Sequence, residues 1–113
     1  SDRYVLSRIL TGKLVKISEL DMGYVDRNGN TVATADMTDQ QHRAMADYYK
    51  FIVRKYFEIV PAAQQYGITQ WCMTDAPGAI GTGWRGGEPV GLWDQNYNRK
   101  YAYAGFADGL RAM

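Results

Sequence analysis

The chain of 113 residues is poor in the residues that build disulfides and metal sites: it has one cysteine, Cys72, and one histidine, His42. One thiol cannot form an intramolecular disulfide, and one cysteine with one histidine falls short of a zinc-binding set. The sequence therefore predicts neither a disulfide framework nor a metal site, and it leaves the redox compartment open.

An excess of charge of one sign is also absent, since 13 lysines and arginines stand against 12 aspartates and glutamates, with no basic cluster. This balance argues against nucleic acid or an anionic membrane as the main partner. The apolar runs are too short to cross a bilayer, and the first residues lack the basic-then-apolar pattern of a signal peptide. We expect one small soluble domain over residues 1–113.

Aromatic residues are abundant by contrast, with nine tyrosines and three tryptophans against only three phenylalanines. Tyrosine and tryptophan combine an apolar ring face with a polar tip. Sugars present flat C–H faces fringed with hydroxyl groups, so this surplus is compatible with carbohydrate binding. Core packing is the alternative, because it accounts for most aromatic residues in most proteins.

The first half of the chain predicts a helix end, a strand and a long loop. Apolar residues over 4–10 with Gly12 behind them are typical of a helix C-terminus. Residues 13–20 are apolar and partly β-branched, which predicts a strand buried on both faces apart from Lys16. A polar stretch with turn residues over 23–36 predicts a loop after this strand.

A long helix begins next, at the capping box of Thr38 and Gln41. Pro61 ends or kinks it, and a second turn follows through Gln65. Its apolar side chains recur at three or four residues and are assigned to the core: Met45, Tyr49, Ile52, Tyr56 and Ile59.

The second half predicts a strand over 68–74 with Asp75 at its tip, a glycine-rich loop over 76–89 and a last helix over 98–112. Long loops therefore occur only at the carboxyl ends of strands, which is the layout of a (β/α)8 barrel. A complete barrel takes about 250 residues, so these elements amount to roughly a quarter of one.

Two carboxylates stand at the end of the first strand, in the sequence Ser18-Glu19-Leu20-Asp21. Regular alternation places Glu19 and Asp21 on one face, above Ile17 and Val15. One carboxylate can react there while the other orients its surroundings. The alternative is a solvated loop entry, which is the commoner reason for two acids at a strand end.

The joint order of these residues resembles the C-terminal end of glycoside hydrolase family 10, the retaining endo-β-1,4-xylanases. Ser18 to Asp21 match the family's Thr/Ser-Glu-Leu-Asp motif on the seventh barrel strand, and Trp71, Thr74 and Asp75 match its Trp-Gly-x-Thr-Asp motif at the eighth. The resemblance implies an α/β fold that is the C-terminal part of a (β/α)8 TIM barrel: the end of helix 6, strand 7, helix 7, strand 8 and helix 8.

The resemblance also implies roles for individual residues. Glu19 would be the nucleophile that attacks the anomeric carbon of xylose, and Asp21 would orient it. Trp71 and Trp84 would line the sugar subsite, and Arg85 would reach a substrate hydroxyl. The chemistry needs no metal or organic cofactor, the partner is xylan or a xylo-oligosaccharide, and the location implied by the family is extracellular or periplasmic.

Three departures from the family pattern stand out. Cys72 replaces the usual glycine after the first tryptophan, and the stretch up to Trp84 is lengthened by residues 76–83. The third departure is an absence: no Asn-Glu motif occurs to supply the general acid. Among the other glutamates, Glu58 falls on a helix, and Glu88 falls in a loop, where a solvated role is expected.

Three readings follow from this pattern. In the first, the chain is part of a xylanase that is inactive alone and becomes active when the N-terminal part of the barrel completes it. In the second, it is a non-catalytic fragment that still binds xylo-oligosaccharides through its tryptophans. In the third, it is a structural fragment that self-associates through exposed strand edges.

Overall fold

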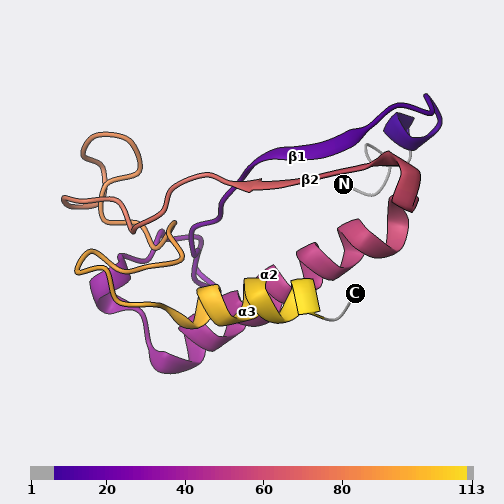
Figure 1. Ribbon diagram of the computed structural model, residues 1–113. Coiled ribbons are helices and arrows are strands. Elements are labelled where there is room, and N and C mark those ends of the chain that lie inside the picture. Colours follow the sequence, from indigo (N-terminus) through magenta and orange to yellow (C-terminus); the bar gives the residue numbers. More distant parts are fainter. Residues whose placement is uncertain (1–6, 112–113) are drawn as a thin grey trace.

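The computed structural model describes residues 7–111. Its two strands lie side by side above two packed helices, and the long loops gather at the carboxyl ends of both strands (Figure 1). The elements follow the order β1 (Val15–Leu20), η1 (Thr34–Asp36), α2 (Asp39–Ile59), η2 (Ala62–Gln64), β2 (Gln65–Gln70) and α3 (Tyr101–Arg111). None of the helices within residues 7–111 is long and apolar enough to span a membrane.

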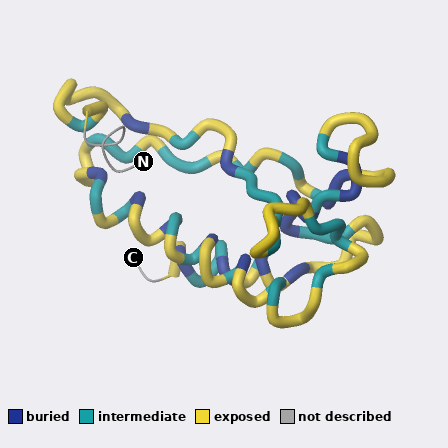
Figure 2. The backbone as a smooth tube through the Cα atoms, turned by 180° about the vertical axis from the view of Figure 1, so that it is seen from behind, coloured by how far each residue is buried: buried dark blue, intermediate teal, exposed yellow. Residues whose placement is uncertain are grey.

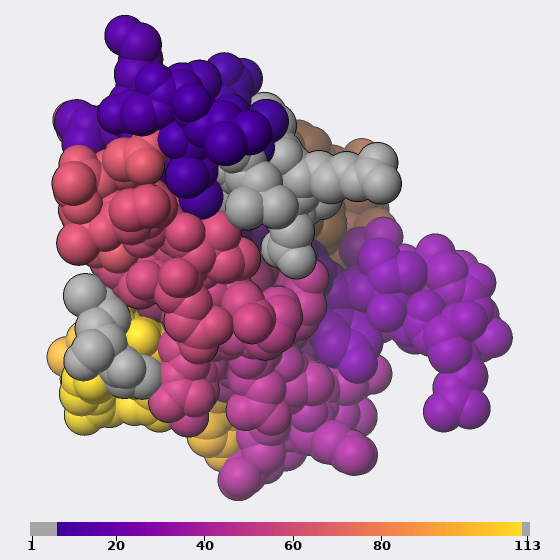
Figure 3. All heavy atoms as spheres, turned by 90° about the vertical axis from the view of Figure 1, so that its right-hand side faces the viewer, coloured from indigo at the N-terminus to yellow at the C-terminus, as the bar shows by residue number. Residues whose placement is uncertain are grey.

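The two strands pair in parallel, with Val15 opposite Gln65, Ile17 opposite Ile68, and Leu20 opposite Gln70. Parallel neighbours require a crossover connection, and α2 supplies it on one face of the pair. Seen from the amino ends of the strands, the first strand lies at the top, the second below it and α2 at the bottom, with α3 at the side of α2 (Figure 3). The predicted alternation of strand, helix and strand is confirmed.

A β-bulge interrupts β1 just before its end. Ser18 and Glu19 together stand opposite the single residue Thr69, because the flanking pairs are Ile17 with Ile68 and Leu20 with Gln70. An extra residue of this kind reverses the alternation of side chains along a strand. Leu20 therefore packs toward α2 on the same face as Ile17.

The expectation that Glu19 lies on the face of Val15 and Ile17 is consequently wrong. Val15 packs with Tyr56 of α2, and Ile17 contacts the same cluster, whereas Glu19 is exposed. The expectation depends on side chains alternating regularly along β1. The bulge breaks this alternation, and it arises from pairing with a strand about fifty residues further along the chain.

The core lies between the sheet and the two helices. Tyr49 and Val53 of α2 are fully buried, and Leu20, Met45 and Leu92 pack in one cluster with Tyr49. Burial raises the pKa of Tyr49 to about 12, so its phenol stays neutral in this core. Because the apolar stripe of α2 forms this core, its assignment from the sequence is confirmed for Met45, Tyr49 and Tyr56.

Helix α3 packs closely against α2 because it has glycine at the contact. A Cβ atom at Gly105 would lie 2.0 Å from the carbonyl oxygen of Ala46, far inside contact distance. Any larger residue would therefore push the helices apart.

The predicted limits of α2 are confirmed at both ends. The Thr38 hydroxyl accepts a hydrogen bond from the Gln41 N–H, and the Gln41 side chain accepts one from the Thr38 N–H, so the capping box is complete. The helix ends at Ile59, two residues before Pro61, and the short η2 follows as the second turn. At the chain start, residues 7–9 are helical and Leu10 lies in the turn that follows, whereas residues 4–6 of the predicted segment lie outside the described residues.

The other element limits differ from prediction. Strand β2 covers Gln65–Gln70 instead of 68–74, because Cys72 has φ of +74° and leaves the extended region. Helix α3 starts at Tyr101 rather than at 98, because Asn98 belongs to a turn closed by Asp94. The predicted end of α3 at residue 112 lies outside the described residues.

Burial of the first strand on both faces is also wrong. Lys16, Ser18 and Glu19 are exposed, and the burial colours show a pair of strands that is covered on the helix side only (Figure 2). The helices cover one face, and no described segment of the chain covers the other.

Candidate active site at the carboxyl ends of the strands

Glu19 is aimed by the backbone of the bulge. It lies near the carboxyl end of β1, on the face turned away from α2, and its side chain is exposed. Among residues 7–111, its carboxylate has no hydrogen-bond or ion-pair partner. Bulges commonly re-aim a side chain next to an active site, and here the re-aimed side chain is an acid with both oxygens open to a ligand.

Asp21, two residues further on, is bound by Arg85. One guanidinium nitrogen of Arg85 donates to the Asp21 carboxylate, and Nη2 and Nε donate to Glu88 at 3.3 and 3.4 Å. The three side chains are 19 to 28% exposed. The guanidinium thus joins the loop after β1 to the glycine-rich loop after β2.

The electrostatics of this cluster favour the charged guanidinium. Burial alone would lower the pKa of Arg85, but its hydrogen bond to Glu88 and the charge of Asp21 raise that pKa above its ordinary value. Glu88 is therefore a partly buried ion-pair partner, not the solvated loop residue that the sequence suggested.

Both predicted tryptophans are on the surface at this end of the molecule. Trp71 is 46% exposed, and its backbone N–H donates to the carbonyl oxygen of Leu20 at 2.9 Å, which places it beside the end of β1. Trp84 is 54% exposed, and the guanidinium of Arg85 lies over its ring at 5.6 Å from the centroid. Asp21, Arg85 and Trp84 thus form one contiguous group, with Trp71 beside the strand that carries Glu19.

Cys72 occupies a backbone position that suits glycine. Its φ of +74° lies in the left-handed region, which side chains with a Cβ atom rarely adopt. This is the position where the family pattern has glycine, the residue that adopts this conformation without a Cβ penalty. Burial raises the pKa of the Cys72 thiol, which keeps it protonated near neutral pH.

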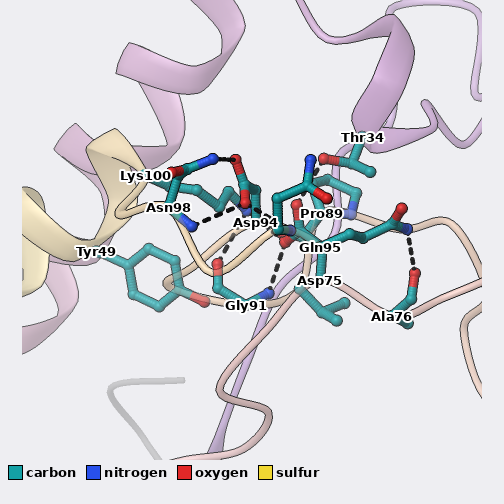
Figure 4. A network of polar contacts seen from close by, with 12 residues as sticks. Thr34, Tyr49, Asp75, Ala76, Pro89, Gly91, Asp94, Gln95, Asn98 and Lys100 are labelled. Carbon is teal, nitrogen blue, oxygen red and sulfur yellow. Dashed lines mark hydrogen bonds and ion pairs between the residues drawn. The ribbon is translucent and has the colours of Figure 1, made fainter.

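A buried network under the loops was missed by sequence reasoning (Figure 4). Asp75 is 1% exposed, and its carboxylate accepts three hydrogen bonds: from Lys100 Nζ at 2.6 Å, from Thr34 Oγ1 at 2.6 Å and from the Gly91 N–H at 3.0 Å. The donors come from η1, from the loop before α3 and from the residue directly before α3. Asp75 therefore fixes three segments at the tip of the second strand.

The ammonium group of Lys100 donates three hydrogen bonds, as many as the Asp75 carboxylate accepts. Its ammonium group also donates to the carbonyl oxygens of Pro89 and Gly91 at 3.1 and 2.9 Å. Burial lowers the pKa of Lys100, and the Asp75 carboxylate opposes that shift. Nothing local marks this pair in the sequence, because its members are 25 residues apart and each stands at the edge of an element.

The loop before α3 is shaped by Asp94. Its carboxylate accepts the backbone N–H groups of Asn96 and Asn98 at 2.8 and 2.9 Å, and the hydrogen bond from Asn98 holds the pKa of Asp94 below its ordinary value. Gln95 donates to the carbonyl oxygen of Ala76 at 2.7 Å and so ties this loop to the one after β2. Residues 7–111 contain no group of three His, Cys, Asp or Glu side chains that could hold a metal ion.

Comparison with known proteins identifies the family. The model of glycosyl hydrolase family 10 matches residues 3–109. Endo-beta-1,4-xylanase Xyn10C of Cellvibrio japonicus is 33% identical over 88% of this chain, and endo-1,4-beta-xylanase A of the same species is 31% identical over 85%. The chain spans 18% and 17% of these two relatives.

Solved structures agree with the sequence match. The chain superimposes with a TM-score of 0.76 and 27% identity on xylanase 10C of C. japonicus, an E385A mutant in complex with xylopentaose, covering 99% of this chain and 24% of that one. The fold is therefore part of the (β/α)8 barrel of these enzymes. The chain belongs to glycosyl hydrolase family 10.

Proposed function

We propose that this chain supplies the nucleophile and part of the sugar subsite of a retaining endo-1,4-β-xylanase. In this proposal β1 and β2 are strands 7 and 8 of the barrel, α2 and α3 are helices 7 and 8, and the described helical residues 7–9 end helix 6. The observation that carries it is the bulge, which leaves Glu19 unpaired on the open face at the carboxyl end of a barrel strand.

Glu19 acts as the nucleophile. Its carboxylate attacks the anomeric carbon of a xylose unit, the bond to the leaving sugar breaks, and a covalent glycosyl-enzyme intermediate forms. Water then attacks the same carbon, and the carboxylate is released with overall retention of configuration. An unpaired, exposed carboxylate suits this role because no ion pair has to be broken before it reacts.

Asp21 positions the loop behind the nucleophile. Its partner Arg85 also binds Glu88 and lies over Trp84, so one cation links the acid-bearing loop to the ring that contacts sugar. Trp71 and Trp84 contribute the apolar faces on which a sugar ring packs. Arg85 donates its hydrogen bonds to the carboxylates of Asp21 and Glu88, so its contact with a substrate hydroxyl is secondary to this positioning role.

The general acid comes from another part of the barrel. A retaining enzyme needs a second carboxyl group about 5 Å from the nucleophile. Glu58 is paired with Lys55 on the outer surface of α2 at 3.2 Å, and Glu88 is bound to Arg85. Neither is placed to serve, so the N-terminal part of a family 10 barrel is the partner that completes the site.

The substrate class is β-1,4-xylan. Two solved relatives are complexes with xylopentaose, and both named relatives are xylanases. Secretion follows from the substrate, because a polymer of this kind is degraded outside the cytoplasm, so we infer an extracellular or periplasmic location.

The test is reducing-sugar release from beechwood xylan by the chain mixed with, or joined to, the N-terminal part of a family 10 barrel. Activity is expected in the completed barrel and a loss of at least a thousandfold with Glu19→Gln. Glu58→Gln is the matched control, since it removes an exposed helical glutamate. Full activity in the Glu19→Gln variant would remove Glu19 as the nucleophile.

Binding without cleavage is the second candidate function, favoured by the exposure of Trp71 and Trp84 in the isolated chain. A saturable change in tryptophan fluorescence on titration with xylohexaose would support it, and a flat titration would exclude it. Both strands also have one unpaired edge, so self-association is the structural alternative. Light scattering decides it, because a monomer would rule it out.

A further inference from the structure

A recess lies on one side of Trp84, the ring that also belongs to the proposed sugar subsite, and its other lining residues lie outside that subsite. It measures about 550 Å³, and its walls come from the segment after β2, the glycine-rich loop and the loop before α3. Neither carboxylate of the proposed site lines it, nor does Trp71. The lengthened stretch over 76–83, in which this chain departs from the family pattern, forms part of its wall.

The lining of the recess is uncharged throughout. Its principal side chains are Cys72, Met73, Trp84 and Tyr97. Trp84 is 54% exposed and Tyr97 is 75% exposed, so two aromatic rings face solvent at this one recess. Such a wall suits a neutral ligand with an apolar face and hydroxyl groups at its rim, and it offers no partner for a charged one.

Strained backbone is concentrated at the same place. Within residues 7–111, three residues other than glycine have positive φ: Cys72 at +74°, Arg85 at +51° and Tyr97 at +65°. Two of them line the recess, and the third directly follows Trp84. Backbone strain of this kind persists mainly at functional positions, where the surrounding structure imposes it.

Tyr97 is held in its strained conformation by the loop around it. Its N–H donates to the carbonyl oxygen of Asp94 at 3.1 Å, and the Asp94 carboxylate fixes the residues on either side. Gln95 anchors this loop to Ala76, at the start of the glycine-rich loop (Figure 4). The tyrosine ring is thus presented at the surface by a braced turn instead of being buried.

We propose that this recess is an additional binding site for a neutral pentose ring of xylan, with Trp84 and Tyr97 as its aromatic contacts. The proposal rests on the proposed function for the identity of the polymer. The ring is either a xylose unit of the main chain or an arabinose side group, since both have the same uncharged, hydroxyl-fringed chemistry.

The test is a titration of the isotopically labelled chain with xylopentaose, followed by NMR at each backbone amide. Shifts at Cys72 and Tyr97 that saturate support the recess, and shifts at Glu19 and Trp71 support the proposed cleavage subsite. Shifts at the second pair alone overturn the recess and leave the proposed function standing. Shifts at the first pair alone support the recess, and no shift at the first pair overturns it. The proposed function is tested separately, by the activity of the completed barrel.

A variant sharpens the result. Tyr97→Asn removes the ring, and asparagine tolerates the left-handed backbone, so the fold is expected to survive. The dissociation constant at the recess should rise about tenfold while the shifts at Trp71 are unchanged. Tyr48→Ala, which removes an exposed tyrosine from α2, is the control. Trp84→Leu is the second variant. If both variants bind at the recess with the affinity of the native chain, the proposal is overturned.

An arabinose-substituted xylotetraose distinguishes the two sources of the ring. Tighter binding of this ligand than of xylopentaose, lost in Tyr97→Asn, assigns the recess to the side group. Equal or tighter binding of the unbranched ligand assigns it to the main chain.

Discussion

Two acid–base clusters lie at the carboxyl ends of the strands, and they differ in depth. Asp75 and Lys100 are buried, with side chains 0 and 5% exposed, and their polar atoms are bound within the protein. Asp21, Arg85 and Glu88 are partly exposed and lie beside an unpaired glutamate. The buried cluster holds the loops together, whereas the open cluster is accessible from the surface.

Rigidity is concentrated in the buried pair. A buried ion pair has no alternative partner in water, so breaking it affects the whole loop assembly. A partly exposed cation can exchange protein partners for solvent at small cost. The Asp75–Lys100 pair is therefore expected to stay fixed, while the side chains of Asp21, Arg85 and Glu88 can rearrange when a ligand binds.

The largest effect is expected from Lys100→Met. It leaves the Asp75 carboxylate buried without a cation, which should lower the free energy of unfolding by about 3 to 5 kcal/mol. Urea denaturation followed by circular dichroism measures it. Lys55→Met is the matched control: it breaks an exposed pair with Glu58 and should cost less than about 1 kcal/mol. Equal losses in the two variants would contradict the contrast between buried and open clusters.

The open cluster should affect activity more than stability. Arg85→Met is expected to lower kcat of the completed barrel on xylan by about tenfold to a hundredfold, since Asp21 and Trp84 both lose the cation that positions them. The loss in unfolding free energy should stay near about 1 to 2 kcal/mol. Arg85→Lys should restore part of the activity, because it keeps the charge but not the planar fork. An unchanged kcat in Arg85→Met would remove the positioning role.

The strained backbone at Cys72 predicts a gain. Cys72→Gly should raise the free energy of unfolding by about 1 kcal/mol, because glycine adopts the left-handed conformation without a Cβ penalty. Cys72→Ala is the control, since it removes the thiol and keeps the strain. A gain in both variants would trace the effect to the thiol instead of the backbone.

The smallest effect concerns pH. Burial and the charge of Lys100 lower the pKa of His42 below 6.5, against the opposing pull of Asp75 and Asp39. The unfolded chain then binds more protons below pH 6.5, so stability should fall as the pH drops through the window between the two pKa values. Comparison of urea midpoints at pH 7.5 and 5.5 should show a larger drop in the native protein than in His42→Gln. Equal drops would exclude His42 as the source.

Local signals in the sequence predicted the elements well. The capping box at Thr38 and the proline at 61 fix both ends of α2, because each acts through atoms only a few residues away. The parallel order of the strands followed from the long helix between them. The family itself was predicted from Ser18 to Asp21 and from the spacing of the tryptophans, and the comparisons confirm it.

Features that depend on distant partners were not predictable in the same way. The bulge depends on how β1 pairs with β2, and the Asp75–Lys100 pair depends on how two loops fold over one another. The left-handed conformation of Cys72 was hidden because the residue is not glycine. The roles of Glu19, Asp21 and the tryptophans stay predictions that the experiments above test.

The bulge lets β1 hold one residue more than β2 over the same length while Ile17 and Leu20 both stay on the helix side. With Ser18 removed, the remaining residues would alternate regularly and would still pair Leu20 with Gln70, so the core would hardly change. With one more residue inserted beside Ser18, the strand would need a wider distortion to keep Leu20 inside. The number of residues between Ile17 and Leu20 can therefore change without moving the core, and the present number includes one residue that has no partner of its own in β2.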